Sequence, residues 1–138
     1  MATLPQLRIP MKSKTQQLQK IEIKKTFEIE SARFLPKLPA SHPCSKTHGH
    51  SFKITLRLQG PVDLKLGWLI DYNDITKVAG PTLKKIDHTL LNKVPGLKNP
   101  TTENITIWLY EKLKTDLPEL VQVITKETSD TECAYPVL

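Results

Sequence analysis

Hydrophobic and polar residues alternate along two stretches of the chain, and this alternation predicts two β-strands. In residues 21–30, two pairs of apolar side chains each keep a period of two, with a slip between the pairs that predicts a bulge. The alternation restarts at His50, with apolar side chains on one face and polar side chains on the other, and ends at Gly60. A half-buried strand of an antiparallel sheet has this pattern.

Two later stretches have the three-to-four-residue apolar spacing that is typical of helices. Residues 71–86 start with Asp71, Asn73 and Asp74, which favour a helix start, and we expect Pro81 to kink or interrupt this helix. A second helix follows Thr101, another cap candidate, and we expect Pro118 to end it.

The remaining pieces of the chain complete an α+β domain. Residues 34–49 contain three prolines and a glycine and are predicted to form a loop, and residues 119–127 are predicted to form the last strand. The order strand, strand, helix, helix, strand suits an antiparallel sheet with two helices on one face. The length of 138 residues fits a single domain.

Charge is distributed unevenly along the chain. The 20 Lys and Arg residues outnumber the 14 Asp and Glu residues, which would suit a nucleic-acid partner. However, residues 1–25 hold six of the bases and one acid, so the rest is almost neutral. We therefore predict a basic N-terminal arm over residues 1–20, a single domain over residues 21–138, and no nucleic-acid partner. The acid-poor arm also weakly resembles an organellar transit peptide.

Composition also narrows the expected setting of the protein. No apolar run approaches the roughly 18 residues that a membrane span needs, so we expect no membrane association. The two cysteines, Cys44 and Cys133, are too few for a disulfide framework, which favours a reducing cytoplasm.

Three of the four histidines lie within nine residues, around the start of the second predicted strand. His48 and His50 are two residues apart, and on a strand this spacing places both imidazoles on one face. Two neutral imidazoles can help to hold Zn²⁺, although on spacing alone a solvated strand start is the simpler explanation. Cys44 lies nearby in the proline-rich loop, where it is either a reactive thiolate beside cationic or metal neighbours or a buried structural thiol.

Two further positions could transfer protons or bind a ligand. Asp87 and His88 follow the first predicted helix, where they form either a proton-transfer pair or a helix cap. Glu127 closes the last predicted strand. Its carboxylate could accept two N–H bonds from an aminopyrimidine ring, or it could be an ordinary solvated strand end.

Taken together, these motifs resemble the family of 6-pyruvoyl-tetrahydropterin synthase and 6-carboxytetrahydropterin synthase. The resemblance runs from about residue 27 to residue 135 and is closer to the bacterial branch that serves queuosine biosynthesis. The stretches that carry it are CSKTHGHSF (44–52), GWLIDY (67–72), IDHTLLN (86–92), PGLKNPTTE (95–103) and KET (126–128).

The resemblance implies a fold, an assembly and a reaction. The fold is the tunnelling fold, in which antiparallel sheets with helices on one face assemble into trimers and stack into hexamers, with sites between subunits. The implied reaction converts 7,8-dihydroneopterin triphosphate to 6-carboxytetrahydropterin, acetaldehyde and triphosphate. The alternatives are aldol cleavage of a related pterin, 6-pyruvoyl-tetrahydropterin synthesis, or a non-catalytic or zinc-independent protein that binds a pterin or purine.

The resemblance also implies catalytic roles for individual residues. His48 and His50 would be two zinc ligands, and the zinc would act as a Lewis acid that acidifies a substrate C–H bond. Cys44 would move the proton. His88, steadied by Asp87, would be its relay partner.

Pterin binding would fall to Glu127, with the Thr101-Thr102 turn nearby.

One position departs from the family pattern. A third zinc histidine is expected at the end of the first strand, just before a Leu-Pro pair, and here that position is Arg33. Arginine stays protonated in proteins and has no lone pair to give to a metal.

Three explanations of this departure stay open. His42 or Cys44 could serve as the third ligand. Alternatively, the site could be metal-free, with the Arg33 guanidinium binding substrate oxyanions where zinc would lie. Finally, the chain could be a binding protein that keeps the pterin pocket without the lyase chemistry.

Overall fold

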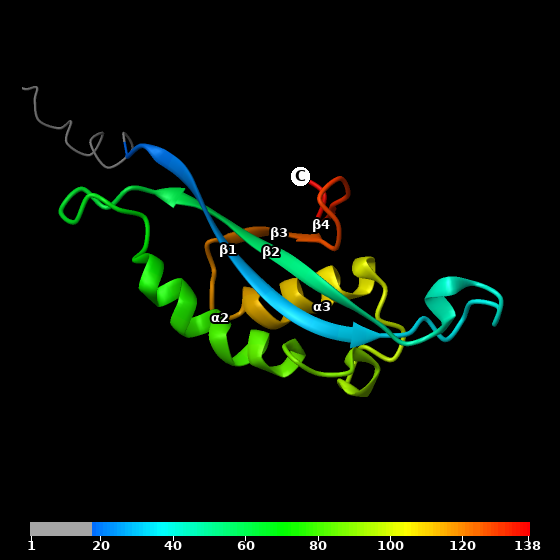
Figure 1. Ribbon diagram of the computed structural model, residues 1–138. Helices are drawn as coiled ribbons and strands as arrows, with labels where there is room; N and C mark the ends of the chain where they lie inside the picture. The colour runs from blue at the N-terminus through cyan, green and yellow to red at the C-terminus, as the bar shows by residue number, and fades with distance from the viewer. Residues whose placement is uncertain (1–17) are drawn as a thin grey trace, which may run out of the picture.

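The computed structural model describes residues 18–138, which form a four-stranded antiparallel sheet with two helices between its second and third strands (Figure 1). The strands lie in the sheet in their chain order, β1-β2-β3-β4. The predicted α+β class, with helices on one face of an antiparallel sheet, is confirmed. Most of the expected basic arm, residues 1–17, lies outside the described residues.

Two long strands, β1 (Lys20–Arg33) and β2 (His48–Pro61), form the hairpin that carries most of the predicted motifs. Their register is continuous along the whole hairpin and ends with Arg33 opposite His48. The predicted bulge in β1 is therefore wrong. The two apolar pairs of β1 are four residues apart, an even spacing that keeps them on one face, and Lys25 occupies the position between them.

The sheet is completed by β3 (Leu120–Lys126) and β4 (Cys133–Tyr135). β3 matches the predicted last strand, but β4 follows it and was not predicted. The sheet does contain one irregularity, a register shift between Arg57 and Leu58 where β2 meets β3. This shift lies where β2 pairs with β3. The bulge that the alternation suggested would lie in β1, which pairs with the other edge of β2.

Both helices begin at the capping residues that the sequence indicated. α2 (Tyr72–Ile86) is capped by Asp71 and α3 (Thr102–Lys114) by Thr101, and each side chain accepts a backbone N–H of the first turn. Pro81 lies within α2, which continues past it, so the expected interruption is wrong. α3 ends before the proline that was expected to stop it. Two short 3₁₀ helices, η2 (Pro43–Ser45) and η3 (Leu91–Lys93), lie in the connections.

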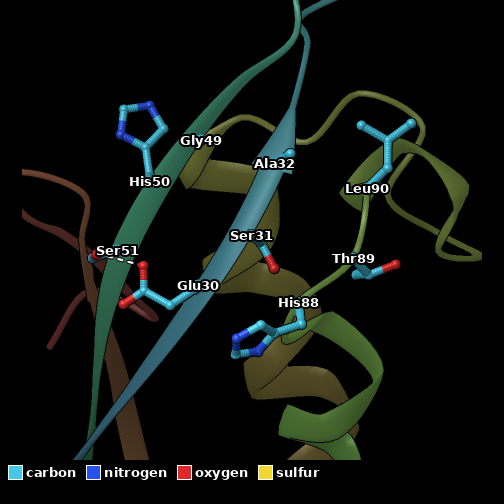
Figure 2. A pocket seen from close by; sticks show the side chains of 9 residues that line it. All are labelled: Glu30, Ser31, Ala32, Gly49, His50, Ser51, His88, Thr89 and Leu90. Atoms are coloured by element: carbon cyan, nitrogen blue, oxygen red, sulfur yellow. Dashed lines mark hydrogen bonds between the residues drawn. The ribbon is translucent and has the colours of Figure 1, made fainter.

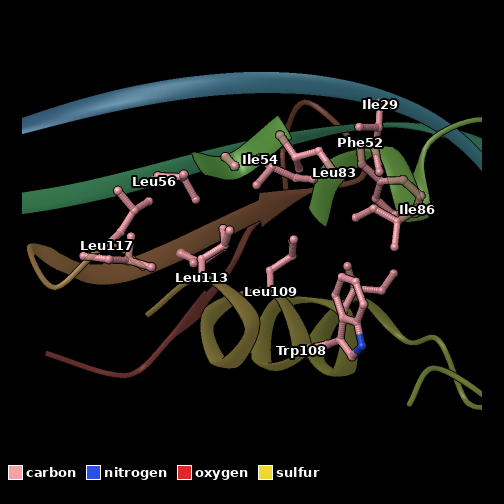
Figure 3. Packing of buried hydrophobic residues seen from close by; sticks show 14 of the residues in the cluster. Ile29, Phe52, Ile54, Leu56, Leu83, Ile86, Trp108, Leu109, Leu113 and Leu117 are labelled. Atoms are coloured by element: carbon pink, nitrogen blue, oxygen red, sulfur yellow. The ribbon is translucent and has the colours of Figure 1, made fainter. Parts of the chain in front are cut away.

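The hydrophobic core lies between the sheet and the helices (Figure 3). Alternate residues of β2 are completely buried there, as the alternation predicted, and each such side chain contributes about 1.5–3 kcal/mol. The buried side chains of β2 and the helices include Phe52, Ile54, Leu56, Leu58, Ile75, Ile86, Leu109 and Leu113. Among the described residues, no helix is long and apolar enough to cross a membrane.

Candidate active site

The core-facing side of the β1–β2 hairpin changes from apolar to polar beyond Phe52. The next two residues on this face of β2 are His50 and His48, whose ring centroids are 4.9 Å apart in an edge-to-face arrangement. Their opposite residues on β1 are Ser31 and Arg33. The predicted common face of the two histidines is confirmed, and the register places Arg33 beside them.

Arg33 is buried, with 2% of its surface exposed, and its guanidinium is held on several sides. Nη1 donates to the Pro100 carbonyl at 3.0 Å and to Thr102 Oγ1 at 3.3 Å, while Nη2 donates to Glu127 Oε1 at 2.8 Å. The guanidinium carbon lies 5.3 Å from the centroid of the Phe52 ring, close enough for a cation–π contact. Arg33 is therefore paired with the carboxylate that the family resemblance assigns to pterin binding.

Glu127 follows β3 directly and has two donors on one oxygen. The Thr102 hydroxyl and Arg33 Nη2 both donate to Oε1, whereas neither donates to Oε2. Burial by itself would raise the pKa of Glu127, but the hydrogen bonds from Thr102 and Arg33, with the charge of Arg33, outweigh it and lower the pKa overall. The carboxylate is therefore ionised at neutral pH. Thr101, the other predicted pterin-binding threonine, uses its hydroxyl to cap α3 instead.

His50 lies next to this pair. Its Nε2 is 3.9 Å from Glu127 Oε2. Burial lowers the pKa of His50, and the positive charge of Arg33 lowers it further, while Glu127 acts in the opposite direction. The net pKa lies below the usual histidine range, so His50 is a neutral imidazole at pH 7.

The residues around the two histidines do not fit a zinc ion. Zn²⁺ in proteins takes at least three side-chain ligands, and residues 18–138 contain no cluster of three His, Cys, Asp or Glu side chains placed to hold a metal. His48 binds the Lys46 carbonyl through Nδ1, and its Nε2 is buried with no hydrogen-bond partner. The remaining position, where a third ligand would be needed, holds the Arg33 guanidinium, which donates hydrogen bonds and cannot ligate a metal.

Asp87 and His88 are in contact at the C-terminal end of α2, with Asp87 Oδ1 2.8 Å from His88 Nδ1. Asp87 also accepts the Glu30 backbone N–H at 2.9 Å, which fixes the pair to the edge of β1. His88 has a φ of 55°, a conformation that side-chain-bearing residues adopt at a cost. The pair therefore lies at the predicted helix end, and the two side chains are in contact there.

A cavity of about 580 Å³ lies along the end of the β1–β2 hairpin, and in Figure 2 the rings of His50 and His88 lie on opposite sides of the two strands. Its lining includes Glu30 and Ser31 of β1, His50 of β2, and His88 beyond α2. His88 is largely exposed, with 76% of its side chain accessible. The structure therefore brings His50 and His88, which are far apart in the sequence, to one open cavity.

Cys44 lies apart from these groups, in the short helix η2. Its backbone carbonyl accepts the Leu35 N–H at 2.8 Å, and its backbone N–H donates to His42 Nδ1. Within residues 18–138, no hydrogen bond joins Cys44 to His88 or to Glu127. Cys44 also lines neither the cavity of His50 and His88 nor the cavity described next, which contains Glu127.

A second cavity, of about 330 Å³, is lined in part by Glu127 and includes Thr125, a residue that the sequence did not suggest. Thr102, Thr125 and Cys133 line it together with Glu127. Thr125 is completely buried, and its Oγ1 has no hydrogen-bond partner. The sequence could have indicated Thr125, because it lies in β3 two residues before Glu127, and this spacing places both side chains on one face.

Comparisons with known proteins agree with this geometry. Residues 22–136 match the family described as "6-pyruvoyl tetrahydropterin synthase". The chain is 29% identical over 126 residues to the 6-carboxy-5,6,7,8-tetrahydropterin synthase of Bacillus subtilis, covering 83% of this chain and 84% of that protein. It is 38% identical over 71 residues to the dihydroneopterin monophosphate aldolase of Pyrococcus furiosus, covering 51% of this chain. That alignment spans less than two-thirds of the relative, 59% of its length.

The fold comparison gives the same family. The structure of Caenorhabditis elegans 6-pyruvoyl tetrahydropterin synthase superposes with a TM-score of 0.78 at 25% sequence identity. The superposition covers 86% of this chain and 96% of the other. The tunnelling fold that the motifs implied is therefore confirmed.

Proposed function

The chain belongs to the 6-pyruvoyl tetrahydropterin synthase family, and from this premise we propose that it is a pterin lyase of the 6-carboxytetrahydropterin synthase type. It would convert 7,8-dihydroneopterin triphosphate to 6-carboxytetrahydropterin, acetaldehyde and triphosphate. The observation that supports a pterin substrate best is the ionised Glu127 carboxylate, which lines the 330 Å³ cavity with its Oε2 free of the Thr102 and Arg33 bonds.

Glu127 suits the pyrimidine edge of a pterin. That edge presents an exocyclic amino group and a ring N–H side by side, and a carboxylate accepts such a pair with both oxygens. Oε1 is already oriented by Thr102 and Arg33, and Oε2 is available to a ligand. Thr125 offers a further hydroxyl in the same cavity.

Proton transfer would use Asp87, His88 and Cys44. The Asp87 carboxylate fixes the tautomer of His88 and stabilises its protonated form, so His88 can accept and return a proton at the substrate side chain. Cys44 would act as the thiolate base that removes a proton from a side-chain carbon. Because Cys44 lies apart from His88 within one chain, the proposal includes assembly into a trimer or hexamer in which subunits complete each other's sites.

An aldolase reaction is the second candidate, and the archaeal aldolase relative favours it. The two reactions start from a similar trihydroxypropyl side chain but release different small products. Aldol cleavage between the first and second side-chain carbons releases a two-carbon aldehyde that keeps the phosphate ester, whereas the synthase reaction releases acetaldehyde and free triphosphate. The small product therefore separates the two candidates.

The test is incubation of the purified chain with 7,8-dihydroneopterin triphosphate, followed by mass spectrometry of pterin and aldehyde products. We expect 6-carboxytetrahydropterin and acetaldehyde, loss of both in Cys44→Ala, and no loss in Ser41→Ala, a change in the same loop. A two-carbon aldehyde that still carries the phosphate ester would favour the aldolase. Saturable pterin binding without any product would show a binding protein rather than an enzyme.

A further inference from the structure

The end of β1 carries a buried positive charge where the family resemblance expects a metal ligand. We propose that Arg33 takes the place of a metal ion in this site, so that its guanidinium supplies the fixed positive charge and His48 and His50 bind no zinc. The inference rests on the proposed function only in treating Glu127 as the ligand-binding carboxylate. Its geometric basis is independent of any reaction.

The guanidinium is fixed in place by three acceptors, two at the start of α3 and one just after β3. Nη1 reaches the Pro100 carbonyl and the Thr102 hydroxyl, and Nη2 reaches Glu127, while the plane lies near the Phe52 ring. A planar cation held by three acceptors and a ring cannot swing out of the site without breaking all of these contacts. Its charge is therefore a permanent part of the site.

The position of this charge disfavours a divalent cation at the histidine pair. Arg33 is opposite His48 in the strand register, and side chains at such opposite positions are neighbours on the sheet face. A zinc ion on His48 and His50 would lie beside a buried guanidinium that cannot lose its proton. Like charges at short distance in a partly buried site repel strongly.

The hydrogen-bonding groups that remain unused also fail to match a metal. His48 Nε2 is a buried acceptor without a partner, which a metal could use, but Arg33 Nε–H is a buried donor without a partner. A cation accepts no hydrogen bond, so bound zinc would leave this donor unsatisfied. Together with the missing third ligand, this mismatch argues against zinc at the histidine pair.

The Arg33 guanidinium supplies the positive charge that a metal ion would otherwise supply, and this charge acts on Glu127. Glu127 is ionised because Thr102 and Arg33 donate to it and because Arg33 is positively charged, against the effect of its burial. Arg33 is therefore a positioning residue that holds the carboxylate charged and turned so that Oε2 stays available.

The test measures metal content rather than turnover. The full chain, Arg33→His and the control Arg57→His are each purified from zinc-supplemented cultures without chelator and analysed by plasma mass spectrometry. Arg57 is a matched control because it is also an ion-paired arginine of the same sheet. Each chelator-treated protein is then titrated with zinc sulfate in a calorimeter, and its fold is checked by circular dichroism.

We expect no stoichiometric zinc in the natural chain or in Arg57→His, and about one zinc per chain in Arg33→His, with at least about 100-fold tighter binding. One tightly held zinc per natural chain, lost in His48→Ala, would overturn the proposal. A folded Arg33→His that still binds no zinc would also overturn it, because Arg33 would then not be what excludes the metal. Neither result depends on the reaction. A failure of this metal-free proposal can therefore be distinguished from a failure of the proposed lyase function. If Arg33→His does not fold, the measurement on the natural chain still decides.

Discussion

Replacing Arg33 with methionine tests how much the buried ion pair contributes to stability. Methionine keeps much of the side-chain volume and the contact with the Phe52 ring but removes all donors. The change leaves Glu127 with only the Thr102 hydroxyl as donor and leaves the Pro100 carbonyl without its guanidinium partner. The buried site then holds an uncompensated negative charge.

The magnitude follows from the burial of the two partners. Breaking a fully buried pair costs about 3–5 kcal/mol, and exposed pairs are worth about 1 kcal/mol or less. The Arg33 side chain is 3% exposed and that of Glu127 is 28% exposed, so this pair lies between the two cases. We expect a loss of about 2–3 kcal/mol at pH 7, a fall in melting temperature of roughly 8–12 °C for a domain of this size.

The pH dependence checks the mechanism. The pKa of Glu127 is lowered in the folded chain, so its contribution to stability is present above the unfolded pKa and is lost as pH falls through the folded pKa. Without Arg33, burial becomes the dominant influence and raises the pKa of Glu127. The difference between the natural chain and Arg33→Met should therefore be largest near pH 7 and shrink below about pH 4.

Chemical denaturation at pH 7, 5 and 3.5 measures these differences, with Arg57→Met as control. Arg57 also forms an ion pair, at 2.7 Å to Glu22, but its side chain is 22% exposed, so a loss of about 1 kcal/mol is expected. The reasoning is refuted if Arg33→Met costs no more than Arg57→Met at pH 7. It is also refuted if the cost of Arg33→Met stays constant across this pH range.

Three further changes test other parts of the structure. In α2, Gly80→Ala should add about 0.5–1 kcal/mol of stability, because an added Cβ has no other atom near it. Gly96→Ala should instead cost more than about 1 kcal/mol, because Gly96 has a φ of 92° and its added Cβ would press against the Trp108 indole. Thermal melts in which both changes shift stability in the same direction would contradict this. Thr125→Val should add about 1 kcal/mol to the free energy of unfolding, because it removes a buried hydroxyl without a partner. The same change should weaken the binding of 7,8-dihydroneopterin several-fold in a fluorescence titration. An unchanged affinity would show that Thr125 is not part of the binding site. Asp87→Asn should lower kcat by about 100-fold with a smaller change in KM, and an unchanged kcat would mean that the contact with His88 only ends the helix.

Local sequence patterns were sufficient for most of the fold. The alternation in β2 and the caps Asp71 and Thr101 depend on neighbours within one strand or one helical turn, so the sequence displays them directly. The errors concern features that depend on distant parts of the chain. β4 is three residues long and is defined by its pairing with β3, and Pro81 is tolerated inside a helix that packs against the core.

The candidate site divides in the same way. Spacing alone placed His48 and His50 on one face, and the family resemblance implied that Thr102 lies near Glu127, as the structure has them. The contact that organises the site, between Arg33 and Glu127, joins residues 94 positions apart, and no local pattern indicates it. Sequence reasoning could identify Arg33 as unusual but could not say which group its charge would meet.

The length of the side chain at position 33 explains how one residue can decide between two kinds of site. The backbone there lies opposite His48, so a short imidazole at position 33 would stay beside the histidine pair, in reach of a shared metal. The arginine side chain instead extends past Phe52 and reaches Glu127 and the start of α3. The residue at the end of β1 can therefore either complete a metal site or form an ion pair with Glu127. Because Glu127 lies at the junction of both, the choice at position 33 also sets the charge that a bound pterin would meet.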